Sequence, residues 1–169
     1  MRKTKLSQRE VEKFLKQQDV YTLHKPIIRK FTRRRVYVKG IDDQWQIDLV
    51  DMRNLSQKNN HYNYILTIID CFSKYAWGIP IKKKTGEFIS EAFNKLFKGE
   101  RIPKKIQSDK GLEFVNKTTQ ELFKKHNIHW FTTQNETKAQ IVERFNRTLR
   151  GLMFRYFTAN QTKIWIDVL

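Results

Sequence analysis

The chain has 169 residues, of which 34 are Lys or Arg and 17 are Asp or Glu, so its formal net charge at pH 7 is +17. This surplus of cations excludes an ordinary enzyme of small acidic metabolites and indicates a polyanionic partner, most often nucleic acid. Aromatic residues make up 13% of the chain, which excludes a wholly disordered protein, and the single cysteine, Cys71, excludes a disulfide framework.

The charge is distributed unevenly along the chain. Residues 1–40 contain 13 basic and 3 acidic side chains, whereas residues 41–80 contain 3 basic and 5 acidic ones. Carboxylates bind hard divalent cations, so an acidic segment in a basic protein is a candidate metal site. The alternative is that these acids lie in turns or are solvated. No apolar stretch approaches the roughly 20 residues of a membrane helix, and we expect no membrane partner.

The first 40 residues predict a basic N-terminal arm that is partly helical and partly extended. Ser7 and Glu10 form a capping box in front of apolar residues at helical spacing, which favours a helix over about 8–18. A run of guanidinium groups follows at Arg33, Arg34 and Arg35. Such a run indicates contact with phosphates or nuclear targeting, and the alternative is a solvated linker.

Residues 41–169 predict a domain that contains both strands and helices. Strand-like segments over 45–50, 62–70 and 75–81 are joined by short turns, which indicates an antiparallel meander. Helical and strand-like patterns then alternate, with expected elements over 85–99, 104–108, 116–125, 128–132 and 137–157. This order predicts an α/β fold with a mixed five-stranded sheet flanked by helices. We expect the buried stripe of the last helix at Val142, Phe145, Leu149, Leu152 and Tyr156.

Three acidic residues stand out by their positions in these elements. Asp48 lies inside the first strand, Asp109 directly follows the fourth strand, and Glu143 lies beside the apolar stripe of the last helix. A charge inside a central strand has to be paired or to bind a metal. For Asp48 taken alone, the alternative to a metal site is a buried ion pair with one of the many Lys or Arg side chains.

Polar and basic side chains follow Glu143 on the same helix. Asn146, Arg147 and Arg150 lie three, four and seven residues further on and therefore share its face. This arrangement indicates a metal-bound carboxylate next to cations that bind a phosphate backbone. The alternative is a solvated i,i+4 ion pair, which is usually worth a few tenths of a kcal/mol.

Four motifs of the chain resemble those of one known family. They are Trp-Gln-Ile-Asp at 45–48, Ile-Asp-Cys-Phe-Ser-Lys-Tyr at 69–75, Ser-Asp-Lys-Gly-Leu-Glu-Phe at 108–114 and Ile-Val-Glu-Arg-Phe-Asn at 141–146. Together they resemble the catalytic core of retroviral-type integrases, and they look most like the integrases of Maverick/Polinton self-synthesising DNA transposons. The order of the three acids matches, and the separation of 34 residues between Asp109 and Glu143 is close to the usual spacing of that family.

The resemblance covers about residues 44–169 and implies an RNase H-like fold. It implies that Asp48, Asp109 and Glu143 are catalytic and hold two metal ions, Mg²⁺ or Mn²⁺. Asn146, Arg147 and Arg150 match helix positions that contact DNA in relatives, and we expect Lys110 and Lys138 to contact DNA as well. The chain departs from the family in two places, because Lys110 stands where relatives usually have Asn and the loop over 135–140 lacks their usual Pro and Gly.

The implied activity is metal-dependent processing of the 3′ ends of element DNA, followed by strand transfer into target DNA. We expect a basic arm over 1–40 and an integrase catalytic core over 41–169 that is incomplete at its C-terminus. The expected partners are element and target DNA and further copies of the chain, in the nucleus or in a virion or element-encoded particle.

One alternative is a nuclease of the RNase H type, with Asp51 or Glu113 as a competing ligand, although Asp51 is expected on the opposite sheet face from Asp48. The other is a non-catalytic DNA-binding module.

Overall fold

The computed structural model describes four parts of the chain, residues 7–17, 36–99, 101–132 and 139–169. The chain divides into two compact units, Met1–Arg34 and Arg35–Leu169. Four of the residues singled out in the sequence lie outside the described parts, namely Arg33, Arg34, Arg35 and Lys138. Their predicted contacts with DNA therefore stay predictions.

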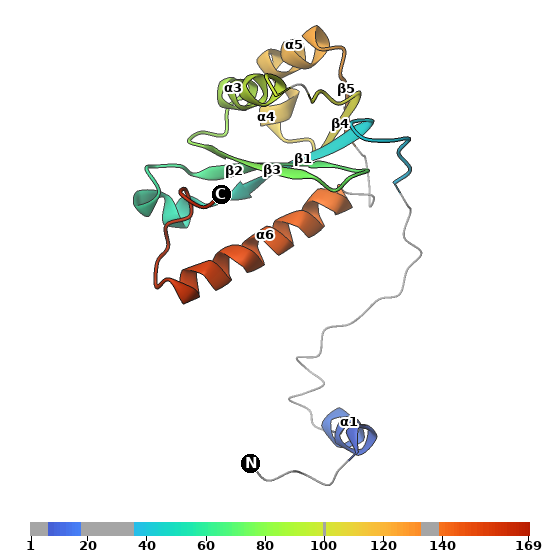
Figure 1. Cartoon of the computed structure of the whole chain (residues 1–169), viewed down its shortest axis with the longest axis vertical. Helices are drawn as coiled ribbons and strands as arrows, with labels where there is room; N and C mark the ends of the chain where they lie inside the picture. Colours follow the sequence, from blue (N-terminus) through green and yellow to red (C-terminus); the bar gives the residue numbers. More distant parts are fainter. Residues whose placement is uncertain (1–6, 18–35, 100, 133–138) are drawn as a thin grey trace. The chain divides into compact units, whose positions relative to one another are not determined.

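The described part of the first unit contains helix α1 (Gln8–Lys16) (Figure 1). The predicted capping box is present: the backbone N–H of Ser7 donates to the Glu10 carboxylate at 2.8 Å, and the backbone N–H of Glu10 donates to Ser7 Oγ at 3.3 Å. The helix ends two residues before the predicted end at residue 18. A helix of this length is marginal by itself, so its cap contributes much of its stability.

The second unit is built on a five-stranded mixed sheet, which confirms the prediction (Figure 1). Its strands are β1 (Gln44–Asp51), β2 (Tyr64–Asp70), β3 (Ala76–Ile81), β4 (Lys105–Ser108) and β5 (His129–Thr132). They lie in the order β3-β2-β1-β4-β5; β1, β2 and β3 form the expected antiparallel meander, whereas β4 pairs parallel with β1 and β5 parallel with β4. Strand β3 is an edge strand, where its Pro80 costs no ladder hydrogen bond.

Helices cover both faces of this sheet. They are α3 (Gly86–Phe97), α4 (Leu112–Val115), α5 (Lys117–Lys125) and α6 (Gln140–Ala159), with a 3₁₀ helix, η1, over Arg53–Lys58. Figure 1 shows α3, α4 and α5 on one side of the sheet and α6 on the other. Among the described helices, none is long and apolar enough to cross a membrane.

Alternate residues of β1 face these two layers. Trp45 and Ile47 are buried in a cluster with Phe93 of α3 and Phe123 of α5, whereas Val50 is buried in a second cluster with Met153 of α6. Because side chains alternate along a strand, Asp48 shares the face of Val50 and is directed to the α6 side of the sheet. Burial of each large apolar side chain contributes roughly 1.5–3 kcal/mol.

The buried stripe of α6 differs from the predicted one. Leu152 was expected to be buried, but it is 56% exposed, and Met153 is buried in its place. The reason is that the polar residue Asn146 belongs to the buried stripe, so the helical period runs from 146 through Leu149 to 153. An apolar pattern alone could not include an asparagine, and the prediction was wrong by one position.

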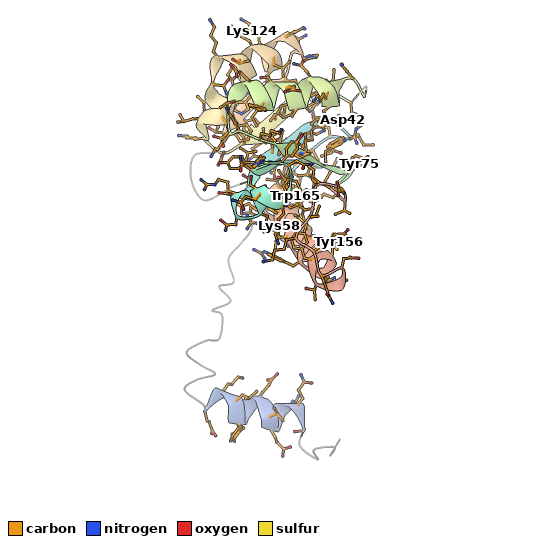
Figure 2. The ribbon with its side chains drawn as sticks, turned by 90° about the vertical axis from the view of Figure 1, so that its left-hand side faces the viewer. Asp42, Lys58, Tyr75, Lys124, Tyr156 and Trp165 are labelled. Carbon is orange, nitrogen blue, oxygen red and sulfur yellow. The ribbon has the colours of Figure 1, made fainter. Side chains whose placement is uncertain are left out.

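The C-terminal segment is attached to the body of the unit by one buried side chain, Asn59. Its amide donates to the carbonyls of Leu55 at 2.7 Å and Lys163 at 3.0 Å, and its Oδ1 accepts from the backbone N–H groups of Trp165 at 2.7 Å and Ile166 at 3.2 Å. Trp165, labelled in Figure 2, is fully buried among the residues between the sheet and α6. Asn59 therefore fixes the segment that closes this core.

Replacing Asn59 by Ala should lower the free energy of unfolding by about 2–4 kcal/mol, because it leaves buried backbone groups without partners. Urea unfolding followed by tryptophan fluorescence measures the change. The control is Asn160→Ala, which removes an exposed bond to the Tyr156 carbonyl and should cost less than about 0.5 kcal/mol. Equal effects of the two substitutions would show that Asn59 does not fasten the segment.

Candidate active site

The three predicted catalytic acids come from three different elements. Asp48 is half-buried in β1, Asp109 is exposed directly after β4, and Glu143 is exposed in the first turn of α6. Because β1 and β4 are parallel and Gln46 pairs with Gln107, the carboxyl ends of the two strands meet at one edge of the sheet. The first turn of α6 is hydrogen-bonded to β1 close to the same edge. The fold therefore brings these acids into one region.

The pKa of the Asp48 carboxyl responds to both of the other acids. Burial raises the pKa of its carboxyl, and the charges of Asp109 and Glu143 raise it further. Two hydrogen bonds act in the opposite direction, since the backbone N–H of Leu49 donates to Oδ1 at 2.7 Å and the amide of Asn146 donates to Oδ2 at 2.8 Å. The net effect is upward, so a cation at this site would relieve the charge.

The other acids of residues 41–80 already have partners within the described chain. Their partners include Arg101 for Asp42 at 2.6 Å, the Lys39 N–H for Asp43 at 3.0 Å, Arg53 for Asp51 at 2.6 Å and the Ser73 N–H for Asp70 at 2.9 Å. Asp48 differs, because no described Lys or Arg forms an ion pair with it. The alternative of a buried ion pair at Asp48 therefore has no support among the described residues.

The acids at the amino end of β1 belong to a structural cluster around Arg101. The guanidinium lies over the rings of Trp77 and Tyr75, at 4.9 and 5.3 Å from their centroids, and contacts both Asp42 and Asp70. Asp42 and Tyr75 are labelled in Figure 2. Arginine stacked on aromatic rings and paired with carboxylates is a stable packing arrangement, so Asp42 and Asp70 have a structural role here.

A second ion pair supports the loop that carries Asp109. Glu113 is buried, and Lys84 Nζ lies 2.9 Å from its carboxylate. The Gly111 N–H donates to Asp109 Oδ1 at 3.1 Å, and a side chain on Gly111 would lie 2.6 Å from the Glu113 carboxylate. A larger residue at 111 would have to displace the Glu113 carboxylate, so the loop packs against the Lys84–Glu113 pair. Glu113 and Asp51, the competing ligands considered in the sequence, are both paired with cations.

The residues present fit a hard divalent cation by their chemistry. Carboxylate oxygens are the ligands that Mg²⁺ and Mn²⁺ prefer, and Asp109 and Glu143 lie near enough to Asp48 to add to the effect of burial in raising its pKa. In the described ranges no three His, Cys, Asp or Glu side chains are already gathered in a metal-binding group. Asp109 and Glu143 are exposed, so their side chains can turn toward a cation that binds at Asp48.

The predicted DNA-contacting residues fall into two groups in the described chain. Lys110, Arg147 and Arg150 are exposed, and Arg147 forms no ion pair with Glu143. Asn146, by contrast, is buried, and its amide is bonded to Asp48. The structure thus gives Asn146 a contact that the sequence did not predict, while its contact with DNA stays a prediction.

Sequence reasoning missed the buried glutamines beside the acids. Gln46 and Gln107 lie two residues before Asp48 and Asp109, and the amide of Gln46 donates to Gln107 Oε1 at 2.9 Å. The signal was present in the sequence as a repeated Gln-x-Asp pattern at the ends of two strands. It went unused because glutamine in a strand is more often a surface residue.

A mixed sheet of this order, covered by helices on both faces and carrying acids at one edge, defines an RNase H-like α/β protein. Residues 40–138 match the family model described as integrase core domain, and the chain belongs to this family. The fold predicted from the sequence is therefore confirmed, as is its membership among integrase cores of the retroviral type.

Relatives of the chain include proteins of transposons and of retroviruses. It is 34% identical over 119 residues to a transposon-derived protein of Caenorhabditis elegans, covering 70% of this chain and 42% of that protein. It is 29% identical over 126 residues to the Gag-Pol polyprotein of avian reticuloendotheliosis virus, covering 73% of this chain and 11% of the polyprotein. The chain thus spans less than half the length of these relatives.

A solved structure shares the fold. The HTLV-2 integrase catalytic core domain, determined in complex with magnesium in a trimeric form, superimposes with a TM-score of 0.60 at 22% identity. The match covers 73% of this chain and 76% of that domain. At this level of identity the likeness supports the fold alone.

Replacing Asp48 by Asn should raise the melting temperature at pH 7 by a few degrees when a chelator is present, because it removes a disfavoured charge. The raised pKa means that the native state binds this proton more tightly than the unfolded chain does. The corresponding stability is fully present below the unfolded value of about 3.9 and is lost as pH rises through the folded value. The gain in the variant should therefore disappear in acid.

Thermal unfolding by circular dichroism from acid to neutral pH measures this effect, with Asp167→Asn, an exposed aspartate, as the control. A variant at position 48 that is less stable than the wild type at pH 7 would contradict the electrostatic argument.

Replacing Lys84 by Met should destabilise the second unit by about 1–3 kcal/mol, because it leaves the buried charge of Glu113 unpaired. The half-exposed position of Lys84 keeps the loss below that of a fully buried pair. Adding Glu113→Gln should recover most of the loss in a urea-unfolding experiment. Lys83→Met, an exposed neighbour, is the control, and a double variant no more stable than Lys84→Met would argue against the pair.

Proposed function

We propose that the chain is the catalytic core of a DNA integrase or transposase that processes the 3′ ends of an element and transfers them into target DNA. The observation that carries the proposal is Asp48, a half-buried carboxylate without a cationic partner among the described residues, whose pKa is raised by burial and further by the nearby Asp109 and Glu143. Membership of the integrase core domain family supports the reaction class.

Asp48, Asp109 and Glu143 are the residues proposed to hold two Mg²⁺ or Mn²⁺ ions. Such a pair of ions activates an oxygen nucleophile and neutralises charge on the reacting phosphate. In the first step a water oxygen attacks phosphorus near the element end, and a 3′-hydroxyl is released. In the second step that hydroxyl attacks a phosphorus of target DNA and displaces a 3′-oxygen, so the number of phosphodiester bonds is conserved. No covalent bond to the protein forms.

Exposed basic residues are proposed to hold the DNA at these acids. Lys110 lies next to Asp109, and Arg147 and Arg150 follow Glu143 by one and two turns of α6. Phosphate contacts by Lys and Arg release counterions, so binding should weaken steeply with salt. The +17 charge of the chain supports a polyanionic substrate.

Three finer proposals accompany this function. Self-association is proposed because two element ends have to be held together, and light scattering with DNA that shows a monomer would contradict it.

Action in the nucleus is proposed from the substrate, and a tagged protein that stays outside the nucleus would contradict it. A Maverick/Polinton-type element is proposed from the four motifs, and flanking DNA without a polymerase gene of its own would contradict it.

Replacing Glu143 by Gln should lower strand transfer of a labelled element end by at least about a hundredfold, since metal-dependent stabilisation of the transition state is worth several kcal/mol. The assay compares reactions in Mg²⁺ or Mn²⁺ with reactions in chelator. The matched control is Glu121→Gln, an exposed glutamate on α5, which should keep the wild-type rate.

Each other outcome of this assay points to a different function. Cleaved but never joined product would favour a nuclease. Salt-sensitive DNA binding with no product and no metal binding by calorimetry would favour a non-catalytic DNA-binding module. Equal strand transfer by the wild type and Glu143→Gln would contradict the assignment of this residue.

A further inference from the structure

We infer that Gln46 and Gln107 form a buried amide bridge that holds Asp48, Asp109 and Glu143 in register, with Gln46 as a positioning residue for the metal-binding acids. The inference rests on the proposed function of these three acids and deepens it. Gln46 and Gln107 would contact neither the metal nor DNA, and their role would be to position the residues that do.

The bridge joins the three elements that carry the acids. The side-chain amide of Gln46 donates to Gln107 Oε1 at 2.9 Å, which connects β1 to β4. Gln46 Oε1 accepts from the backbone N–H groups of Ile141 at 2.9 Å and Val142 at 3.1 Å, which connects β1 to α6. Gln46 is fully buried, so water does not compete for these bonds.

Each connection lies one or two residues before an acid. Gln46 precedes Asp48 by two residues and Gln107 precedes Asp109 by two, so in β1 the glutamine and the aspartate share one face of the sheet. The two N–H groups on α6 belong to the residues directly before Glu143. A short covalent path therefore leads from the bridge to all three carboxyl groups.

The bridge also fixes the rotation of α6. Its N-cap residue, Ala139, has no side chain that can accept a hydrogen bond, and the first N–H groups of a helix have no partner within the helix. Gln46 supplies that partner from the sheet instead of from the helix itself. Successive helical residues differ by about 100°, so a slip of one residue would turn Glu143 away from Asp48.

The neutral amide suits this place for a physical reason. An amide has both a donor and an acceptor, and Gln46 uses them toward Gln107 and α6 at once. A glutamate would add a buried negative charge to the same face of the sheet as Asp48, which already lies near the charges of Asp109 and Glu143. An apolar residue at 46 would remove the hydrogen bonds that the N–H groups of Ile141 and Val142 donate and the one that Gln107 Oε1 accepts from Gln46.

The key substitution is Gln46→Met, which keeps the volume and removes both hydrogen-bonding groups. Its matched control is Gln44→Met on the same strand and face, which removes a bond of 2.9 Å to Gln107 Oε1 but no bond to α6. Binding of Mn²⁺ alone is measured by calorimetry, and protection of the α6 first-turn amides by hydrogen exchange. We expect Gln46→Met to weaken Mn²⁺ binding by about tenfold or more and to lower that protection, and Gln44→Met to have a smaller effect on both.

A third variant separates positioning from simple capping. Ala139→Ser, added to Gln46→Met, supplies a local cap for the same N–H groups without restoring the link to the sheet. We expect it to recover the amide protection of α6 but not the affinity for Mn²⁺. Recovery of both would show that Gln46 only caps the helix, and would overturn the positioning role.

The remaining outcomes distinguish this inference from the proposed function. A wild-type chain that binds Mn²⁺ as tightly as Gln46→Met does would overturn the bridge alone. A wild-type chain that binds no Mn²⁺, and is thus indistinguishable from Glu143→Gln, would overturn the metal site and the bridge with it. If Gln46→Met folds poorly, the double variant with Ala139→Ser is used instead, because its helix cap is restored. Its Mn²⁺ affinity is compared with that of the wild type once both show the same hydrogen-exchange protection of the first turn of α6.

Discussion

The parallel pairing of β1 with β4 is the constraint on which the candidate site depends. Gln46 lies opposite Gln107 in this ladder, so Asp48 and Asp109 emerge at the same edge of the sheet. An antiparallel pair with Gln46 opposite Gln107 would move the two aspartates in opposite directions, to about four residues apart at about 3.3 Å each. The meander of β1, β2 and β3 supplies the rigid support, and α6 is attached to β1 by the two bonds from Gln46.

The charge of the chain is organised around this edge. Acidic residues elsewhere in residues 41–80 are held by Arg101, Arg53 and backbone N–H groups, and Glu113 is held by Lys84. Asp48 remains, with Asp109 and Glu143 close enough to act on its pKa, and exposed Lys110, Arg147 and Arg150 follow these two acids in the sequence. A high positive charge and a concentrated negative site are therefore compatible, because the other acids of residues 41–80 are paired, whereas Asp48 has no described cationic partner and lies near two further acids.

The sequence predicted the elements whose patterns are long, and it failed where the pattern is short or non-local. The β-branched and aromatic residues of β2 and the helical period of α3 were sufficient, and Asp48 stood out because an acid is unusual inside a strand. The helix α4 and the 3₁₀ helix η1 are too short to show a period. Leu152 was wrongly placed in the core because Asn146, a polar residue, occupies the buried stripe. The bonds of Gln46 join residues 61 apart toward Gln107 and 95 or 96 apart toward α6, which no local pattern can indicate.

Asn146 and Gln46 are neutral amides for the same electrostatic reason. Burial, Asp109 and Glu143 all oppose ionisation of Asp48, and the amide of Asn146 is one of two donors that favour it. A lysine at either amide position would pair with Asp48 and compete with the metal, whereas a glutamate would add to the repulsion. A neutral amide can orient the carboxylate and leave its charge available. Within the described residues the Oδ1 atom of Asn146 has no hydrogen-bond partner. Orienting the Asp48 carboxylate through this side chain therefore leaves a buried acceptor without a bond, which lowers stability. Such a cost is expected where the position of a side chain matters more than stability.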